Sequence, residues 1–249
     1  VEPPGIPDFP AVGYDFAPSI GKVKSAREQQ LKEFCVPLWN PNTTSWIVDV
    51  GDPAAQLLAH IDSTKPSLVM LPTHGHGTFR RLLVGSVTNK LLHDAGCAVW
   101  TDSHIEALEA SDHKGCQEVL CGVDLIDLDH DNRLVEWAAG YARIWGARLR
   151  LFHAVPGAKH IPGTPDEPFT STILDWARER LSKFQIDAGT LCEALVQPAT
   201  PGEMIRALVK DPDKSTVIIG RGSSKGFLGR LGSQAYSIIR SSPCPVISV

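Results

Sequence analysis

The sequence predicts an α/β protein made of two related domains, each with a parallel sheet. The first observation is a repeat. Residues 68–100 return at 215–249, and five residues of the first copy recur 147 positions later, namely Gly75, Gly85, Ser86, Cys97 and Val99. A fixed offset across a glycine-rich loop and its apolar flanks indicates a duplicated domain. The second observation is that short apolar runs alternate with segments of helical periodicity after residue 118, which is typical of a parallel sheet with helices on both faces.

The second copy is expected to contain five strands and four helices in alternation. Apolar runs predict strands at 118–125, 148–155, 192–198, 215–220 and 244–249. Apolar residues at helical spacing predict helices at 132–147, 171–189, 202–212 and 233–242. Thr200 and Pro201 have the residue types of an N-cap and a first-turn proline, so they mark the start of the third helix.

The first copy follows the same order but starts late. Pro53 matches Pro201 at an offset of 148, so a one-residue gap is expected between its helix and the glycine loop. Nothing in the first copy corresponds to residues 117–154, which carry the first strand, the first helix and the second strand. The chain also begins without methionine, and we therefore expect it to be part of a longer protein. The alternative is a degenerate domain whose missing strands come from a partner, which would leave pairing edges exposed.

The expected division is an incomplete domain at 1–105 and a complete one at 113–249, joined by the polar segment 103–117. The length of 249 residues suits two such domains. Lys and Arg number 24 against 28 Asp and Glu, with no long basic run, so nucleic acid is not expected as a partner. No apolar stretch is long enough for a membrane span, and the N-terminus does not resemble a signal peptide. The six cysteines show no CxxC pair, so we expect reduced thiols and a cytoplasmic location.

The glycine loop of the second copy is the candidate binding site. The strand before it ends at Gly220, Gly222 follows, and after nine residues Gly232 and Ser233 start a helix. Unpaired amides at a helix N-terminus attract anions, and glycines let the backbone approach them, so the loop predicts a phosphate site. The alternative interpretation is a structural turn with a serine N-cap. The P-loop motif and a helix-opening GxGxxG are both absent, which does not support a P-loop NTPase or a dinucleotide fold.

This pattern of strand, glycine loop, nine residues, Gly-Ser, helix and closing Cys-Pro-Val strand resembles universal stress protein domains. The resemblance covers both copies. It implies Rossmann-like domains of the adenine nucleotide alpha hydrolase-like type, each with a five-stranded parallel sheet in the order 3-2-1-4-5. It further implies ATP, with or without Mg, bound between the first strand and the loop. Final strands commonly form dimer contacts in the family, which here predicts an internal pseudo-dimer or a homodimer through 97–101 and 244–249.

The resemblance also implies a set of nucleotide-binding residues in the second copy. Asp124 would contact adenine, with Ala154 after the strand-ending His153 nearby, and loop and helix amides would hold the ribose and phosphates. The full set is Asp124, Ala154, Gly220, Gly222, Ser223, Gly232, Ser233, Gln234 and Ala235. The Gly220–Gly222 motif is one residue shorter than the GxxG of the family.

The first copy keeps a weaker version of this site. It retains Thr73, Gly75, Gly85 and Ser86, but Pro72 stands where the family has its leading glycine, and proline has no amide to donate. It also lacks the first-strand aspartate. We therefore expect ATP mainly in the second copy.

The leading hypothesis for function is a tandem universal stress protein, a nucleotide-binding module in stress response or signalling. A nucleotide-free interaction scaffold of the same fold and a weak ATPase are the alternatives. No catalytic signature, general base or metal carboxylate is identifiable near the loop, so at most slow ATP hydrolysis is expected. Asp127, Asp129 and Asp131 lack the remaining ligands of a calcium loop and are expected to be solvated at a helix start, and no metal site is predicted.

Overall fold

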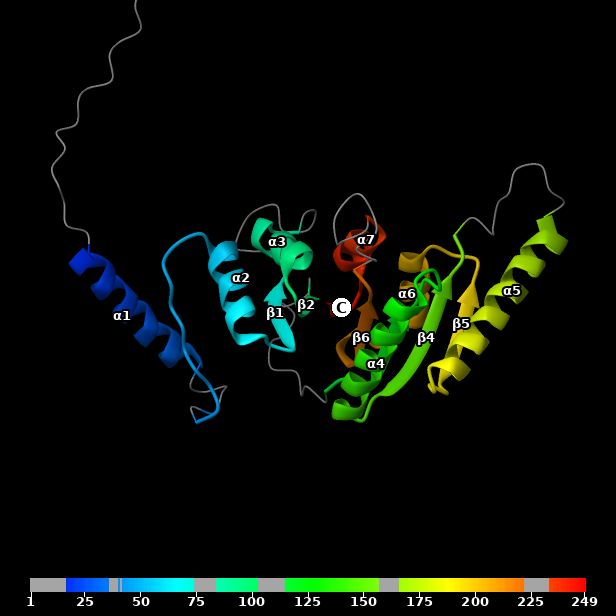
Figure 1. Cartoon of the computed structure of the whole chain (residues 1–249), viewed down its shortest axis with the longest axis horizontal. Coiled ribbons are helices and arrows are strands. Elements are labelled where there is room, and N and C mark those ends of the chain that lie inside the picture. The colour runs from blue at the N-terminus through cyan, green and yellow to red at the C-terminus, as the bar shows by residue number, and fades with distance from the viewer. Residues whose placement is uncertain are drawn as a thin grey trace, which may run out of the picture. The chain divides into compact units, whose positions relative to one another are not determined.

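The structure is a computed structural model that describes residues 17–35, 40, 42–73, 84–102, 115–156, 166–221 and 233–249 (Figure 1). The chain divides into two compact units, Val1–Gln56 and Leu57–Val249. The predicted division into repeat domains at 1–105 and 113–249 stays a prediction.

The first unit contains helix α1 (Ala17–Cys35) and an extended segment that leads to helix α2 (Pro53–Thr64). Lys24 Nζ lies 3.2 Å from Asp49 Oδ1 and joins α1 to the extended segment. The order 3-2-1-4-5 would place a third strand in this segment, but the described residues 42–52 form none. That strand would pair with the second strand, which has no counterpart in the first copy, so its backbone groups lack a ladder partner.

The second unit contains one mixed sheet of seven strands in the order β1-β2-β7-β6-β3-β4-β5. Every neighbouring pair is parallel except β2 and β7, which are antiparallel. The bounds are β1 Leu68–Pro72, β2 Ala98–Asp102, β3 Glu118–Gly122, β4 Arg148–Ala154, β5 Glu193–Gln197, β6 Ser215–Ile219 and β7 Val246–Ser248.

The two copies share this one sheet, whereas a separate sheet was expected for each copy, with the first one incomplete. The second copy does have the expected internal order 3-2-1-4-5, as β5-β4-β3-β6-β7. Among the described residues of the first copy, β1 and β2 are the strands that join this sheet, and they correspond to its fourth and fifth strands. The sheets are continuous because the last strand of each copy pairs with the other.

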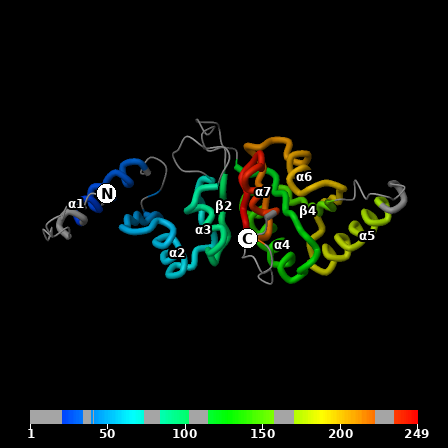
Figure 2. The backbone as a smooth tube through the Cα atoms, turned by 90° about the horizontal axis from the view of Figure 1, so that it is seen from above, coloured from blue at the N-terminus to red at the C-terminus, as the bar shows by residue number. Residues whose placement is uncertain are grey.

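The β2–β7 pair relates the copies by a local two-fold symmetry. Trp100 lies opposite Ile247, and these two residues are equivalent in the repeat. Val99 opposite Ser248 and Thr101 opposite Val246 flank this centre as matching pairs. Figure 2 shows β2 beside the C-terminal end of the chain. The expected contact between final strands is therefore present within one chain, and association of two chains stays a prediction.

Helices cover both faces of the second-copy strands. Helices α4 (Leu128–Trp145) and α5 (Asp166–Asp187) lie on one side, and α6 (Pro201–Leu208) and α7 (Ser233–Ser241) lie on the other (Figure 2). Buried α4 side chains pack on β3 and β6 in one core cluster that includes Leu134, Val135, Ala138, Val119, Cys121 and Ile218. Complete burial of a Leu or Val side chain is worth about 1.5–3 kcal/mol, so this interface fixes α4 on the sheet.

Local sequence signals fix where the helices begin. The Thr200 side chain accepts the amide of Glu203, and the Glu203 side chain accepts the amide of Thr200, which forms a capping box with Pro201 in the first turn. This confirms the predicted helix start. In the first copy, helix α3 (Ser86–Asp94) begins after the N-cap Gly85, which makes no side-chain cap bond. Within the described part of the chain, no helix is long and apolar enough to cross a membrane.

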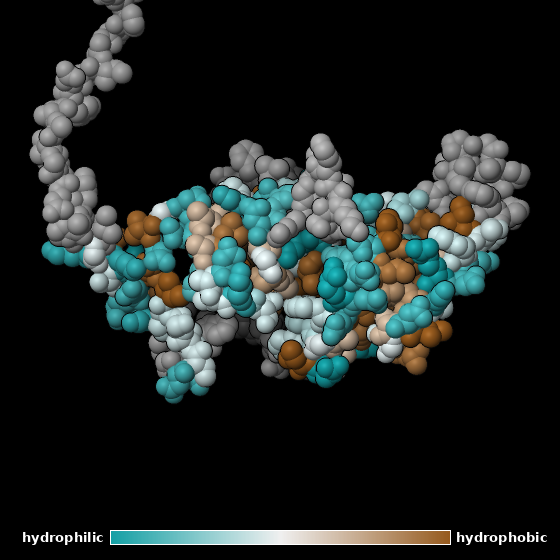
Figure 3. Space-filling view, in the orientation of Figure 1, coloured by the Kyte–Doolittle hydropathy of each residue, from teal (hydrophilic) through white to brown (hydrophobic). Residues whose placement is uncertain are grey.

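Apolar side chains are exposed where α5 and β5 end the sheet. Trp176, Ile186 and Leu191 are 59%, 70% and 88% exposed, and Figure 3 shows hydrophobic patches over this end of the molecule. Trp176 lies on the α5 surface nearest the carboxyl ends of the strands, where the candidate site is found.

Candidate functional site

The candidate site begins with the loop between β3 and α4. Asp124 is exposed, and its Oδ1 accepts the amide of Ile126 at 2.8 Å. Leu125 follows with a left-handed φ of 60°, which is unfavourable for a side chain of this kind. Its amide is held by Asp131 Oδ2 at 2.8 Å, and its carbonyl accepts Arg180 Nη2 at 2.6 Å. Both sides of the loop are therefore fixed in the conformation that presents Asp124.

Asp131 is buried at 1% exposure, which corrects the prediction that it is solvated. Asp127 follows that prediction in part, because it is the N-cap of α4 and accepts the amide of His130 at 3.1 Å. Asp131 points instead to the β3–α4 loop and accepts its amides. Burial raises the pKa of Asp131 to about 6, with a further contribution from the charge of Asp124, while the amides of Leu125 and Asp124 act in the opposite direction.

The end of β4 lies beside Asp124. Gly122 is level with Phe152, so Asp124 and Ala154 each lie two residues beyond a paired position on neighbouring strands. His153 Nδ1 lies 2.9 Å from the carbonyl oxygen of Val123 and joins the two strand ends. The structure thus brings together Asp124 and Ala154, which the family resemblance paired.

A hollow of about 270 Å³ opens next to Asp124, on the side of β4 and α5. Its described lining is Asp124, Leu125, Ile126, His153, Trp176, Ala177 and Arg180. The Arg180 guanidinium lies 5.3 Å from the centre of the Trp176 ring, in a cation–π arrangement. Sequence reasoning missed both residues as part of this site, although a Trp and an Arg four positions apart must share one face of a helix.

The other side of Asp124 leads to the carboxyl end of β6. Ile219 is level with Gly122, and Gly220 follows it. A Cβ atom at Gly220 would collide with Nε2 of His130, so only glycine fits beneath this imidazole. The strand order reverses between β3 and β6, and the crevice at such a switch point is where ligands bind in open α/β sheets.

The described part of the loop includes both of its ends. Ser233, Gln234 and Ala235 form the first turn of α7, where Gln234 is exposed and Ala235 is buried. The predicted residues Gly222, Ser223 and Gly232 lie outside the described residues, as does Gly75 in the first copy.

The first-copy loop ends are joined directly. The amide of Gly85 donates to the Thr73 carbonyl oxygen at 2.9 Å, and Thr88 Oγ1 donates to the Pro72 carbonyl oxygen at 2.9 Å. Ser86 begins α3 at this point and is exposed. Thr73, Gly85 and Ser86 therefore lie together at the end of β1, as the first-copy prediction requires.

The strand register shows where the one-residue gap between the two copies lies. It falls in the glycine loop and not before the strand. Leu71 is level with Thr101, and Ile219 is level with Ser248. Thr101 and Ser248 are 147 residues apart, whereas Leu71 and Ile219 are 148 apart, so the gap lies after the strand and not before it. Pro72 is therefore equivalent to Gly220, and Thr73 is equivalent to Arg221.

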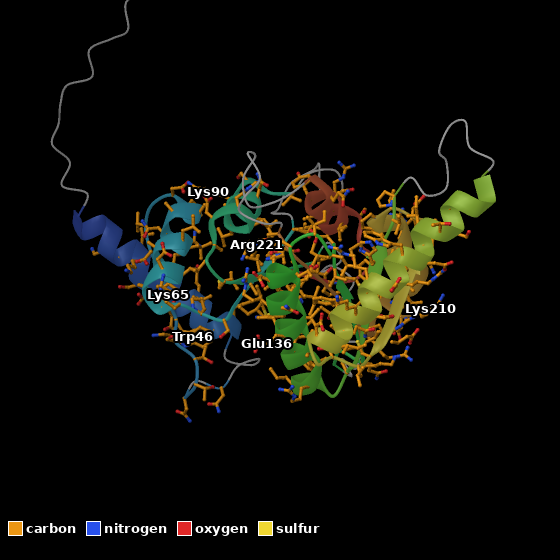
Figure 4. The ribbon with its side chains drawn as sticks, turned by 45° about the vertical axis from the view of Figure 1, so that its right-hand side comes forward. Trp46, Lys65, Lys90, Glu136, Lys210 and Arg221 are labelled. Carbon is orange, nitrogen blue, oxygen red and sulfur yellow. The ribbon has the colours of Figure 1, made fainter. Side chains whose placement is uncertain are left out.

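Arg221 extends from the second-copy loop onto the first copy and is 9% exposed. Its guanidinium donates to the carbonyl oxygens of Ala95 at 2.8 Å, Cys97 at 2.7 Å and Leu92 at 3.4 Å, at the C-terminal end of α3 (Figure 4). A cation at a helix C-terminus is favoured by both charge and hydrogen bonding. Sequence reasoning missed this role because the partners are more than 120 residues away along the chain.

No group of three or more His, Cys, Asp or Glu side chains within the described ranges could hold a metal ion. The described cysteines Cys97, Cys116, Cys121, Cys192 and Cys244 are all free thiols.

The fold is that of a tandem α/β protein whose strand order reverses between β3 and β6. The model of the universal stress protein family matches residues 8–101 and 116–249. These two segments span most of the sequence and correspond to the two copies. The chain belongs to the universal stress protein family, in a tandem arrangement.

A Thermus aquaticus protein described as a universal stress protein in the QAH/OAS sulfhydrylase 3′ region is 31% identical over 128 residues, which is 49% of this chain and 90% of that protein. The crystal structure of a universal stress protein from Archaeoglobus fulgidus has a TM-score of 0.60 at 21% identity and covers 96% of this chain and 81% of its own, which shows the fold. Another structure from Archaeoglobus fulgidus is a universal stress protein in complex with dAMP, at 22% identity, a TM-score of 0.35, and coverage of 53% of this chain and 96% of its own.

Proposed function

We propose that this universal stress protein binds an adenine nucleotide, ATP, in its second copy and acts as a nucleotide-responsive module. The observation that carries the proposal is the switch point between β3 and β6, with Asp124, Ala154 and the hollow beside Asp124 on one side and Gly220 and the start of α7 on the other. A helix N-terminus offers free amides and a partial positive charge to phosphates. Glycine at position 220 makes room for the His130 imidazole, which lies against the backbone at the start of the loop.

The geometry suggests how such a ligand would lie. The base would occupy the hollow beside Asp124, whose Oδ1 is used by Ile126 and whose Oδ2 would accept from an exocyclic amine. The phosphates would extend to the first turn of α7, where the amides of Gln234 and Ala235 belong to the unpaired set at the helix start. Mg²⁺, where present, would be coordinated by the phosphates, as is usual for this ion with nucleotides.

A nucleotide-free scaffold of the same fold is the second candidate. It is favoured by Pro72, which removes an amide from the first-copy loop, and by the hollow of about 270 Å³, which is small beside the ~300–1,000 Å³ of common ligand pockets. A slow ATPase is a third outcome. We also propose a cytoplasmic location, in line with the free thiols of the described cysteines.

The test is titration of the purified protein with ATP, together with mass spectrometry of small molecules released from it. We expect Asp124→Ala to weaken ATP binding about tenfold, roughly 1.4 kcal/mol, because a hydrogen bond to a charged acceptor is lost. Asp129→Ala is the matched control, since Asp129 is exposed on the first turn of α4 and outside the hollow. Equal affinities in all three proteins would refute the assignment of the site, and no ATP binding would favour the scaffold.

A further inference from the structure

One polar atom at the switch point lacks a hydrogen-bond partner. Nε2 of His130 is buried and has no partner among the residues that the structure describes. The same atom lies against Gly220, where it occupies the space that a Cβ would need. The imidazole therefore lies at the switch point between the ends of β3 and β6, and it comes from the first turn of α4.

The backbone of His130 is held in the first turn of α4. The His130 amide donates to the N-cap Asp127 at 3.1 Å, so the backbone belongs to the first turn of α4. The next residue, Asp131, is buried and holds the β3–α4 loop through Leu125. Both contacts hold the first turn of α4 beside the β3–α4 loop, and this turn carries the imidazole that lies against Gly220.

An unpartnered buried nitrogen costs about 1–3 kcal/mol relative to a satisfied one. Such an atom in a native protein calls for an explanation, and a missing ligand is one. The imidazole nitrogen can donate to a sugar or phosphate oxygen or accept from a hydroxyl, depending on its tautomer. A nucleotide would carry these groups to the switch point.

The order of Asp124, Gly220 and the start of α7 along the sheet edge indicates which part of the proposed nucleotide lies next to His130. Asp124 and Ala154 define the base end of the proposed ligand, and the start of α7 defines the phosphate end. Gly220 and His130 lie between them, at the level of the sugar. We propose that His130 contacts the bound nucleotide directly, with Nε2 hydrogen-bonded to a ribose hydroxyl. This inference rests on the proposed function and adds a specificity-determining residue to it.

The test is a comparison of ATP with its 2′-deoxy and 3′-deoxy analogues, by titration of the wild-type protein and of His130→Phe and His130→Gln. We expect the wild-type protein to bind ATP about tenfold more tightly than one of the analogues. His130→Phe should lose this preference and bind ATP and both analogues alike, because the ring shape stays while the nitrogen is gone. His130→Gln should keep part of the preference through its side-chain amide. His60→Phe is the control, since His60 is exposed on α2.

Each outcome decides the inference. Wild-type binding of ATP without any preference over the deoxy analogues overturns the role of His130 and leaves the proposed function intact. The same holds if His130→Phe keeps the full preference. No ATP binding by the wild-type protein overturns both. Should the variants fail to fold, the ring ¹⁵N resonance of His130 in the wild-type protein replaces them: it should shift on addition of ATP and shift less with the relevant analogue, and an unchanged resonance would contradict the contact.

Discussion

The two copies differ at the start of the glycine loop, directly after β6 in the second copy and after β1 in the first. After β6 the chain continues with Gly220 and Arg221, and the arginine donates three hydrogen bonds to the other copy. After β1 the equivalent residues are Pro72 and Thr73, and Thr73 is fully buried with an Oγ1 that has no partner among the described residues. The loop start of the second copy is tied to the first copy through Arg221, whereas the loop start of the first copy is tied to its own helix α3.

This difference shows that duplication preserved the fold while the two loop starts diverged. The second copy keeps the glycine and the ordered β3–α4 loop that a nucleotide site needs. The first copy supplies instead the carbonyl oxygens of Leu92, Ala95 and Cys97 that receive Arg221. The copy that lacks the site features therefore supports the loop of the copy that has them.

The largest expected effect is on Arg221→Met. The variant removes three hydrogen bonds from a charged donor and leaves buried carbonyl oxygens unpaired, so we expect a loss of about 4 kcal/mol in the free energy of unfolding. Urea unfolding measures this loss. Arg206→Met on the exposed side of α6 is the control and should change stability by less than about 0.5 kcal/mol. Equal stability of the two variants would show that Arg221 does not join the copies.

The next effect concerns Asp131, which has no counterpart in the first copy. Its pKa in the folded protein is raised by burial to about 6 from an ordinary value of 3.8, so the folded state binds this proton more tightly than the unfolded state. Its contribution to stability is complete below about pH 4 and is lost as the pH rises through about 6, for a total of about 3 kcal/mol.

Urea unfolding at pH 4 to 7 tests this prediction. Asp131→Asn should remove this part of the pH dependence, whereas Asp129→Asn, at the exposed neighbouring position, should keep it. A pH profile of Asp131→Asn that matches the wild-type profile would argue against Asp131 as the titrating group.

A smaller effect is expected at Thr73. Thr73→Val replaces an unpartnered buried hydroxyl by a methyl group of similar shape, so the free energy of unfolding should rise by about 1 kcal/mol. Thr88→Val is the matched control, because Thr88 Oγ1 donates to the Pro72 carbonyl oxygen and its removal should lower stability by about 1 kcal/mol. Thermal unfolding of both variants gives the signs, and destabilisation by Thr73→Val would mean that this hydroxyl is hydrogen-bonded.

Much of this fold could be predicted from the sequence, because its signals are local. Alternating apolar runs predicted the strands of the second copy, and Thr200 and Pro201 predicted the start of α6. The contact between β2 and β7, which joins the sheets of the two copies, was expected from the family resemblance and not from these local patterns, because it pairs residues about 147 positions apart.

The residues of the candidate site could likewise be predicted only in part from the sequence. Asp124, Ala154 and Gly220 follow from position along the chain and from the family pattern. His130, Trp176, Arg180 and Arg221 do not, because each acquires its role from contacts with distant segments. Asp131 was predicted to be solvated for a related reason: an acidic residue in a first helical turn is usually exposed, and only the loop over it buries this one.

The number of ATP molecules bound per chain tests the central claim most directly. Isothermal titration of the wild-type protein should give a single site per chain, and Asp124→Ala should weaken that site, because only the second copy combines Asp124, Gly220 and the start of α7. Two equivalent sites per chain, or a single site that Asp124→Ala leaves unchanged, would contradict the account.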